Sequence, residues 1–255
     1  MLVSFLGSGN VATHLAAAAS ASGHQIAQVF SPDPAHAQAL ASRFGAEAVS
    51  SIQALRPGAA DIYILAVKDD AIVPLASRLD LGNALVVHTS GSVAMDVLSH
   101  ASSSYGVLYA PQTFVRDVPM DYSDLRFCLE ASSPESYSRL EQFARTISPH
   151  LYPLDSPQRC RLHLASVIIN NFGNALNAMA QQMLDREDIP FEILHPLVLQ
   201  TARKVSHGDL WAQQTGPAVR NDAQTIQKHL QMLSSYPELQ QLYQLMTQII
   251  QDAIH

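Results

Sequence analysis

The chain of 255 residues opens with the apolar run Leu2-Val3-Ser4-Phe5-Leu6, which leads directly into Gly7-Ser8-Gly9-Asn10-Val11-Ala12. The first run is typical of a buried β-strand, and the second has the spacing G-x-G-x-x-A at the start of an alanine-rich helix. Gly7 would let the chain turn sharply, Gly9 would let a pyrophosphate approach the backbone, and Ala12 would let the helix pack closely on the strand. Glycines also close ordinary turns, but the flanking strand and helix favour a dinucleotide site whose phosphates face the free N–H groups of the helix.

The composition narrows the class of protein. Hydrophobic residues make up 47% of the chain and charged residues 15%, and a usual domain size of ~100–200 residues favours two domains. The formal net charge is -7 with scattered lysines and arginines, so we expect neither nucleic acid nor a membrane as a partner. Cys128 and Cys160 have no zinc-type spacing, which predicts no metal site and two free thiols, as in the cytoplasm. Neither a signal peptide nor a membrane span is expected.

Strand-like and helix-like segments alternate through the first part of the chain, which predicts a parallel sheet with helical crossovers. After the opening strand, further strands are expected at Gln25–Phe30, Ala46–Val49, Asp61–Val67, Leu85–His88, Tyr105–Ala110, Arg126–Glu130 and His150–Pro153. Helices are expected at Val11–Ser22, Pro34–Phe44, Ala71–Leu79 and Glu135–Ile147. Ligands bind outside the carboxyl ends of such strands. Besides the Gly7–Ala12 turn, cofactor contacts are therefore expected from Ala66, Val67, Lys68, Thr89 and Ser90.

The residue that follows the second strand bears on the choice between NAD and NADP. An acidic residue there accepts hydrogen bonds from the ribose hydroxyls and favours NAD, whereas a small residue leaves room for the 2′-phosphate of NADP. Ser31 takes that position and favours NADP, although the arginine that usually follows is missing. Asp33 either contacts the ribose or caps the next helix, with Pro34 at the first helical position. NADP is therefore the expected cofactor, and NAD is the alternative.

The pattern changes near Asp155, where strand signals stop and helical periodicity begins. We therefore predict a dinucleotide-binding domain at 1–154 and an all-helical domain at 155–255. One face of a long helix expected at Arg161–Leu184 carries the four polar residues His163, Asn170, Asn174 and Asn177. Asn171 lies beside this face. Burying amides without partners is costly, so this row forms either a hydrogen-bonded network between helices or a wall of the substrate site.

Two further positions in the helical domain are candidates for binding an anion. Arg220 and Asp222 follow the helix-breaking pair Gly216-Pro217 and lie where the next helix begins. Either Arg220 binds an anionic substrate together with free N–H groups, or Asp222 caps the helix and pairs with Arg220. Lys204 either contacts the same anion or is a solvated residue late in its helix.

Six motifs in order along the chain together resemble a bacterial family that pairs a Rossmann-like domain with a helical domain of unknown function. They are Leu6-Gly7-Ser8-Gly9-Asn10-Val11-Ala12, Leu65-Ala66-Val67-Lys68-Asp69-Asp70, His88-Thr89-Ser90-Gly91-Ser92, Pro111-Gln112-Thr113-Phe114, Asn170-Asn171-Phe172 and Gly216-Pro217-Ala218-Val219-Arg220-Asn221-Asp222. Members of this family are described as NADP oxidoreductases of the deazaflavin-dependent type. The resemblance implies a C-terminal domain similar to those of 6-phosphogluconate dehydrogenase and pyrroline-5-carboxylate reductase, and a homodimer formed through that domain.

One position departs from the related β-hydroxyacid dehydrogenases. In that family a catalytic lysine lies three residues before the first of two consecutive asparagines, and this chain has Val167 there. Valine cannot move a proton, so the hydroxyacid mechanism does not carry over. Enzymes similar to pyrroline-5-carboxylate reductase lack this lysine and reduce an imine, and the Val67-Lys68 pair also resembles that branch. An imine or carbonyl substrate is therefore favoured over a 2-hydroxy acid.

These observations favour an NAD(P)-dependent oxidoreductase that transfers a hydride between the cofactor and a small molecule. Residues expected in catalysis are His163, Asn170 and Asn174. His163 is the candidate proton donor, and the alternative is a buried, hydrogen-bonded histidine. Residues expected to bind substrate are Asn171, Lys204 and Arg220. The first alternative is an NADP-binding regulatory or scaffold protein without turnover. The second is an S-adenosylmethionine-dependent methyltransferase, which would need an acidic residue after the second strand.

Overall fold

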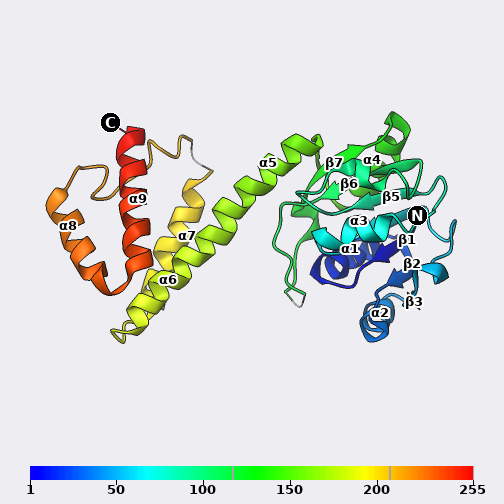
Figure 1. The fold of residues 1–255 in the computed structure, drawn as a ribbon, viewed down its shortest axis with the longest axis horizontal. Coiled ribbons are helices and arrows are strands. Elements are labelled where there is room, and N and C mark those ends of the chain that lie inside the picture. Colours follow the sequence, from blue (N-terminus) through cyan, green and yellow to red (C-terminus); the bar gives the residue numbers. More distant parts are fainter. Residues whose placement is uncertain (117, 207, 255) are drawn as a thin grey trace. The chain divides into compact units, whose positions relative to one another are not determined.

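The computed structural model describes residues 1–116, 118–206 and 208–254. The chain divides into two compact units, unit 1 (Met1–Ile169) and unit 2 (Asn170–His255), coloured from blue to green and from green to red in Figure 1. The boundary between them falls inside the long helical segment that follows the expected domain boundary. The division into domains at 1–154 and 155–255 stays a prediction.

The described residues of unit 1 form an eight-stranded sheet in the order β3-β2-β1-β4-β5-β6-β7-β8. The strands are β1 (Leu2–Leu6), β2 (Gln25–Phe30), β3 (Glu47–Val49), β4 (Ile62–Leu65), β5 (Leu85–His88), β6 (Ser104–Tyr109), β7 (Arg126–Ala131) and β8 (His150–Pro153). The predicted parallel sheet is confirmed except that β6 and β7 pair antiparallel. Among the described residues of the connection between them, η3 (Tyr122–Asp124) is the one helical turn, so they form no helix of the kind that a parallel crossover normally uses.

The central strand β4 is apolar along its whole length because both faces of the sheet are buried. In β4, Ile62 and Ile64 pack on one face with Phe5 of β1, while Tyr63 and Leu65 pack on the other. Alternate residues of a strand point to opposite faces, so one continuous apolar run supplies both cores.

The helices of unit 1 begin at local sequence signals. They are α1 (Asn10–Ala21), α2 (Pro34–Ala41), α3 (Asp69–Ala76), α4 (Pro134–Ile147) and α5 (Ser156–Ser166). The predicted cap of α2 is confirmed, because the Asp33 carboxylate accepts from the N–H groups of Ala35 and His36. Asp155 and Gln158 form a capping box that starts α5. These caps fix the residues at which α2 and α5 begin.

A π-helical turn, η4 (Val167–Phe172), interrupts the long helix predicted at Arg161–Leu184 and separates α5 from α6 (Gly173–Asp185). A π-turn closes i→i+5 hydrogen bonds instead of i→i+4, so the spacing of an α-helix does not hold through it. The prediction that His163 and the three asparagines share one helix face assumed an uninterrupted α-helix and is wrong on this point.

Unit 2 is all-helical, as expected. Besides α6 it contains η5 (Phe191–Leu194), α7 (His195–Lys204), α8 (Ala223–Met232), η6 (Leu233–Ser235) and α9 (Pro237–Ile254). The cap predicted for Asp222 is confirmed, since its carboxylate accepts from the N–H of Thr225 at 3.1 Å and starts α8. In the described part of the chain, no helix combines the length and the apolar character that a membrane crossing requires.

The interior of unit 2 is small. Among its described residues only Ala218 and Leu233 are buried. Large apolar side chains are exposed instead, including Ile193 at 65%, Met232 at 65% and Leu245 at 58%. Unit 1, by contrast, buries two apolar clusters on the faces of its sheet. Apolar exposure on this scale is characteristic of surfaces that bind another protein surface.

Candidate functional site

The glycine turn has the geometry that its sequence predicts. Gly7 adopts φ +122°, and a Cβ atom there would lie 2.2 Å from the carbonyl oxygen of Ala66, so the turn requires glycine on two counts. A Cβ at Gly9 would meet nothing within 4 Å. Gly9 is also the N-cap of α1, whose first turn contains no acidic residue and receives no side-chain cap. The helix start therefore offers free N–H groups facing open space, which fits a pyrophosphate.

The ends of β4 and β5 lie beside this turn, since both strands are close to β1 in the sheet. Ala66 is buried against Gly7, and Lys68 is the exposed N-cap residue of α3. The Ser90 hydroxyl accepts from the N–H groups of Ser92 at 3.1 Å and Val93 at 3.0 Å. These two hydrogen bonds stabilise the loop that contains Ser90.

A cavity of about 180 Å³ opens at the carboxyl ends of these strands. It brings together five of the predicted residues, Val11, Val67, Thr89, Ser90 and His163. The remaining lining residues are Leu15, Asp69, Gly91, Leu108, Tyr109, Ala110, Gln112 and Phe114. The cavity thus combines apolar side chains with several polar groups, as small-molecule sites commonly do.

His163 is held in this cavity by Tyr109. The Tyr109 hydroxyl lies 3.1 Å from Nδ1 of His163, and the two rings meet edge to face with centroids 5.9 Å apart. Burial raises the pKa of Tyr109, so the phenol keeps its proton. The hydrogen bond fixes Nδ1 and leaves Nε2 as the ring nitrogen for another partner.

Gly91 belongs to one of the six motifs, but the sequence did not predict its contact with His163. A Cβ atom at this position would lie 2.7 Å from both Cγ and Nδ1 of His163. The imidazole therefore packs directly on the backbone of the loop after β5, and only glycine leaves room for it. Tyr109 is the last residue of β6 and Gly91 lies in the loop after β5, so a position at the carboxyl end of a strand is the one sequence signal that could have identified their roles.

A buried ion pair fixes the helix that carries His163. Arg159 of α5 is 1% exposed and pairs with the Glu130 carboxylate of β7, and it also donates to the carbonyl of Val93. Ser156, at the start of α5, donates to the same carboxylate through its N–H at 2.9 Å and through its hydroxyl. His163 lies about one turn beyond Arg159, so these contacts also set the position of the imidazole.

His88 is the last residue of β5, directly before the loop that lines the cavity, and it has no exposed surface. Burial and the nearby charge of Arg159 lower the pKa of His88 to about 4. Its Nδ1 accepts from the N–H of Ser90 at 3.2 Å. A neutral imidazole therefore stabilises the Thr89–Ser92 loop through the hydrogen bond from Ser90.

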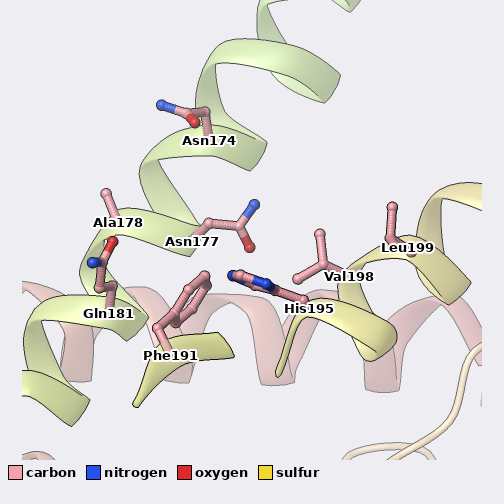
Figure 2. Close-up of a pocket in the computed structure, with 8 residues that line it drawn as sticks. All are labelled: Asn174, Asn177, Ala178, Gln181, Phe191, His195, Val198 and Leu199. Carbon is pink, nitrogen blue, oxygen red and sulfur yellow. The ribbon is translucent and has the colours of Figure 1, made fainter. Parts of the chain in front are cut away.

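Unit 2 has a pocket of its own, with a volume of about 470 Å³ (Figure 2). It is lined by Asn174, Asn177, Ala178, Gln181, Phe191, His195, Val198 and Leu199. Figure 2 shows the Asn177 amide directed toward the His195 imidazole, and the Phe191 and His195 rings meet edge to face at 5.7 Å. The sequence predicted the asparagines but not His195, because nothing local marks it.

The other predicted residues of unit 2 line neither cavity. Asn170 and Asn171 lie exposed in the π-turn, and Arg220 is exposed just before α8. Lys204 is half-buried at the end of α7. The structure therefore groups Asn174 with Asn177 and His195, and leaves the roles of the other four as predictions.

Comparison with known proteins identifies both halves of the chain. Residues 2–91 match the family described as NADP oxidoreductase coenzyme F420-dependent, and residues 125–250 match a domain of unknown function, DUF2520. No curated protein matches the chain. A crystal structure of a "putative NADP oxidoreductase" from Bacteroides fragilis is 38% identical, with 98% of each chain covered and a TM-score of 0.90.

Two reductases share the fold at lower identity. The 1-pyrroline-5-carboxylate reductase of Streptococcus pyogenes is 12% identical, with 99% of this chain and 98% of that chain covered and a TM-score of 0.66. The imine reductase of Streptomyces aurantiacus is also 12% identical, with coverages of 92% and 88% and a TM-score of 0.66. The family predicted from the six motifs is confirmed. The chain belongs to the same family of NADP oxidoreductases as the Bacteroides fragilis protein, and in this chain a segment that matches the coenzyme F420-dependent NADP oxidoreductase family precedes one that matches DUF2520.

Proposed function

We propose that this oxidoreductase reduces a C=N or C=O bond of a small molecule with NADPH, and that His163 protonates the product. The observation that carries this proposal is the Tyr109–His163 hydrogen bond inside a cavity next to the glycine turn. When bound, the nicotinamide cofactor supplies the hydride, which adds to the carbon of the double bond. The electron pair of that bond moves to nitrogen or oxygen, which takes the proton from Nε2 of the His163 imidazolium. The neutral imidazole that remains is then reprotonated by solvent.

The cofactor residues are assigned from the glycine turn outward. The backbone of Gly7, Ser8, Gly9, Asn10, Val11 and Ala12 would hold the pyrophosphate, and further contacts would come from Ser31, Ala66, Val67, Lys68, Thr89 and Ser90. Asp33 supports NADP over NAD, because one of its oxygens accepts from two N–H groups of α2 and the other lies 3.5 Å from His36. This carboxylate is therefore turned toward the helix and not toward a ribose. Ser31 is small and buried, so the end of β2 carries no acidic side chain.

The proposed class of substrate, an imine or a carbonyl compound, rests on the absence of a catalytic lysine. Val167 replaces the lysine of the hydroxyacid dehydrogenases, so no ammonium group is present there to remove a hydroxyl proton. The fold shared with enzymes named for 1-pyrroline-5-carboxylate and imine reduction supports a C=N substrate. We assign Asn170 and Asn174 to catalysis on the sequence pattern alone. On the same basis we assign substrate binding to Asn171, Lys204 and Arg220.

A test of this function separates binding from turnover. Full-length protein is titrated with NADPH and NADH and then assayed against imines, ketones, 2-hydroxy acids and deazaflavin. His163→Asn should lower turnover by about 10²–10⁴-fold, as expected for loss of a general acid, while the Kd for NADPH changes little. Tyr109→Phe should have a smaller effect, because it removes the group that holds Nδ1. His100→Asn, at an exposed position, is the matched control.

Three results would contradict the proposal. Failure of the protein to bind either nicotinamide cofactor would remove the oxidoreductase function. Unchanged turnover in His163→Asn would remove this histidine from the chemistry. Binding of NADPH without turnover of any compound in the panel would favour the regulatory or scaffold alternative.

We also propose that unit 2 forms a homodimer. Its large apolar side chains are exposed and its own interior is small, so a second copy of the same surface would bury them. Ile193→Asp in η5 and Leu245→Asp in α9 should therefore weaken the dimer in sedimentation velocity. Val73→Asp, on α3 of unit 1 and 52% exposed, is the control and should leave the dimer intact. A wild-type protein that sediments as a monomer at micromolar concentration would refute the dimer.

A further inference from the structure

Two hollows lie beside the glycine turn and are separate from the cavity that contains His163. Their volumes are about 210 and 290 Å³, and the side chains of Thr13, Arg43 and Arg116 line both. The first hollow is completed by Ser8 of the turn and by His36, Ala39 and Leu40 of α2. It therefore lies between the start of α1 and the length of α2, the helix that follows β2.

Arg116 reaches this place because α1 holds the loop that follows β6. The Asn10 amide donates to the carbonyl of Phe114 at 2.9 Å, and Nε2 of His14 donates to the carbonyl of Val115 at 2.8 Å. The next residue, Arg116, then donates through Nη2 to the carbonyl of Ser8 at 3.1 Å. Two side chains of the phosphate-binding helix thus place a guanidinium group on the phosphate-binding turn, 108 residues away in sequence.

The two guanidinium groups of the hollows have no matching carboxylate. No aspartate or glutamate is among the described lining residues, and the neighbouring Asp33 carboxylate lies 3.5 Å from the His36 imidazole. Neither Arg43 nor Arg116 forms an ion pair within the part of the chain that the structure describes. Both are exposed, so each has donors left for an anion.

We propose that Arg116 and Arg43 bind the 2′-phosphate of NADP(H) and set the preference for NADP(H) over NAD(H). The inference rests on the proposed function, and it explains how the chain replaces the arginine missing after Ser31. The pyrophosphate has its own site at the N-terminus of α1, whereas this hollow lies against α2, the helix that follows β2, and in dinucleotide folds the adenosine ribose binds at the end of β2. A guanidinium group presents paired donors that match the oxygens of a phosphomonoester.

Ligands that differ only in the 2′-phosphate test this assignment. Dissociation constants are measured by calorimetry for NADPH and NADH, and for adenosine 2′,5′-bisphosphate and adenosine 5′-monophosphate. Arg116→Ala should weaken NADPH and the bisphosphate by about 10- to 100-fold, as expected for hydrogen bonds to a charged group. NADH and the monophosphate should change by less than about twofold, which also shows that the variant is folded. Arg43→Ala should act in the same direction, and Arg116→Lys should recover part of the loss because it keeps the charge.

Arg78→Ala is the matched control, since Arg78 is an exposed arginine just after α3. This helix packs on the opposite face of the sheet from α1 and α2. The control variant should leave all four constants unchanged. Equal weakening of NADPH and NADH by Arg116→Ala would overturn the inference, because the arginine would then serve the turn or the pyrophosphate. Equal affinity of the wild-type protein for NADPH and NADH would also overturn it, while the oxidoreductase function would stand. A wild-type protein that binds neither cofactor would overturn the proposed function itself.

Discussion

Acidification should destabilise unit 1 through His88. This side chain has no exposed surface, and its Nδ1 accepts a hydrogen bond from Ser90. Its Nε2 has no hydrogen-bond partner among the described residues, and the effects of the Ala94 backbone and of the Asp69 charge, which favour the imidazolium form, are smaller than that of burial. Burial and the charge of Arg159 lower the pKa of His88 from 6.5 to about 4. In the unfolded chain the same histidine takes up its proton near pH 6.5.

The sign and size of the effect follow from this difference. Between pH 6.5 and about 4 the unfolded state binds one more proton than the folded state, so the free energy of unfolding falls as the pH falls. Each pH unit in this interval is equivalent to about 1.4 kcal/mol, which gives a loss on the order of 3 kcal/mol at pH 4. The stabilisation is fully present above pH 6.5.

Urea unfolding between pH 7 and pH 4 measures this loss. The variant His88→Asn keeps an acceptor for the N–H of Ser90 but cannot titrate, so its free energy of unfolding should fall less steeply than that of the wild type. The difference between the two proteins should change by about 3 kcal/mol over this range. His100→Asn removes an exposed histidine and should follow the wild type. Parallel curves for wild type and His88→Asn would refute the reasoning.

Three further changes have expected outcomes. Gly91→Ala would place a methyl group 2.7 Å from the His163 ring, so turnover should fall by about tenfold or more while the calorimetric Kd for NADPH stays similar. Arg159→Met leaves the Glu130 carboxylate without its buried partner and should cost about 3–5 kcal/mol in urea unfolding. Asp222→Ala removes the cap of α8 and should cost about 1 kcal/mol in the same measurement. An unchanged value in any of these would contradict the contact on which it rests.

Local signals were sufficient to predict the elements of unit 1. The strands expected at Gln25–Phe30 and Leu85–His88 match β2 and β5 residue for residue, because turn-forming residues lie on both sides of each. Helix ends were less accurate, and α2 ends at Ala41 instead of Phe44. The antiparallel pairing of β6 and β7 was missed, although the absence of a helical segment between them was visible in the sequence.

The candidate site likewise contains residues that a local motif predicts and residues that it does not. The requirement for glycine at Gly7 is set by the backbone of one turn, so a short motif was enough to predict it. Tyr109 and His163 are 54 residues apart, and the contact of Arg116 with the turn spans a still longer distance in sequence. Such contacts depend on how the sheet edge and the loops are arranged in space, and no spacing within the sequence encodes them.

The π-turn Val167–Phe172 has a consequence for how this chain aligns with its relatives. A π-turn is equivalent to one residue inserted into an α-helix, and each added residue rotates the helix face by about 100°. The position equivalent to the dehydrogenase lysine lies inside this turn, at Val167, and an alignment can place the inserted residue on either side of it. The equivalent position then moves to Ser166 or to Ile168. Neither side chain supplies an ammonium group, so this chain lacks the lysine in every register that the insertion allows.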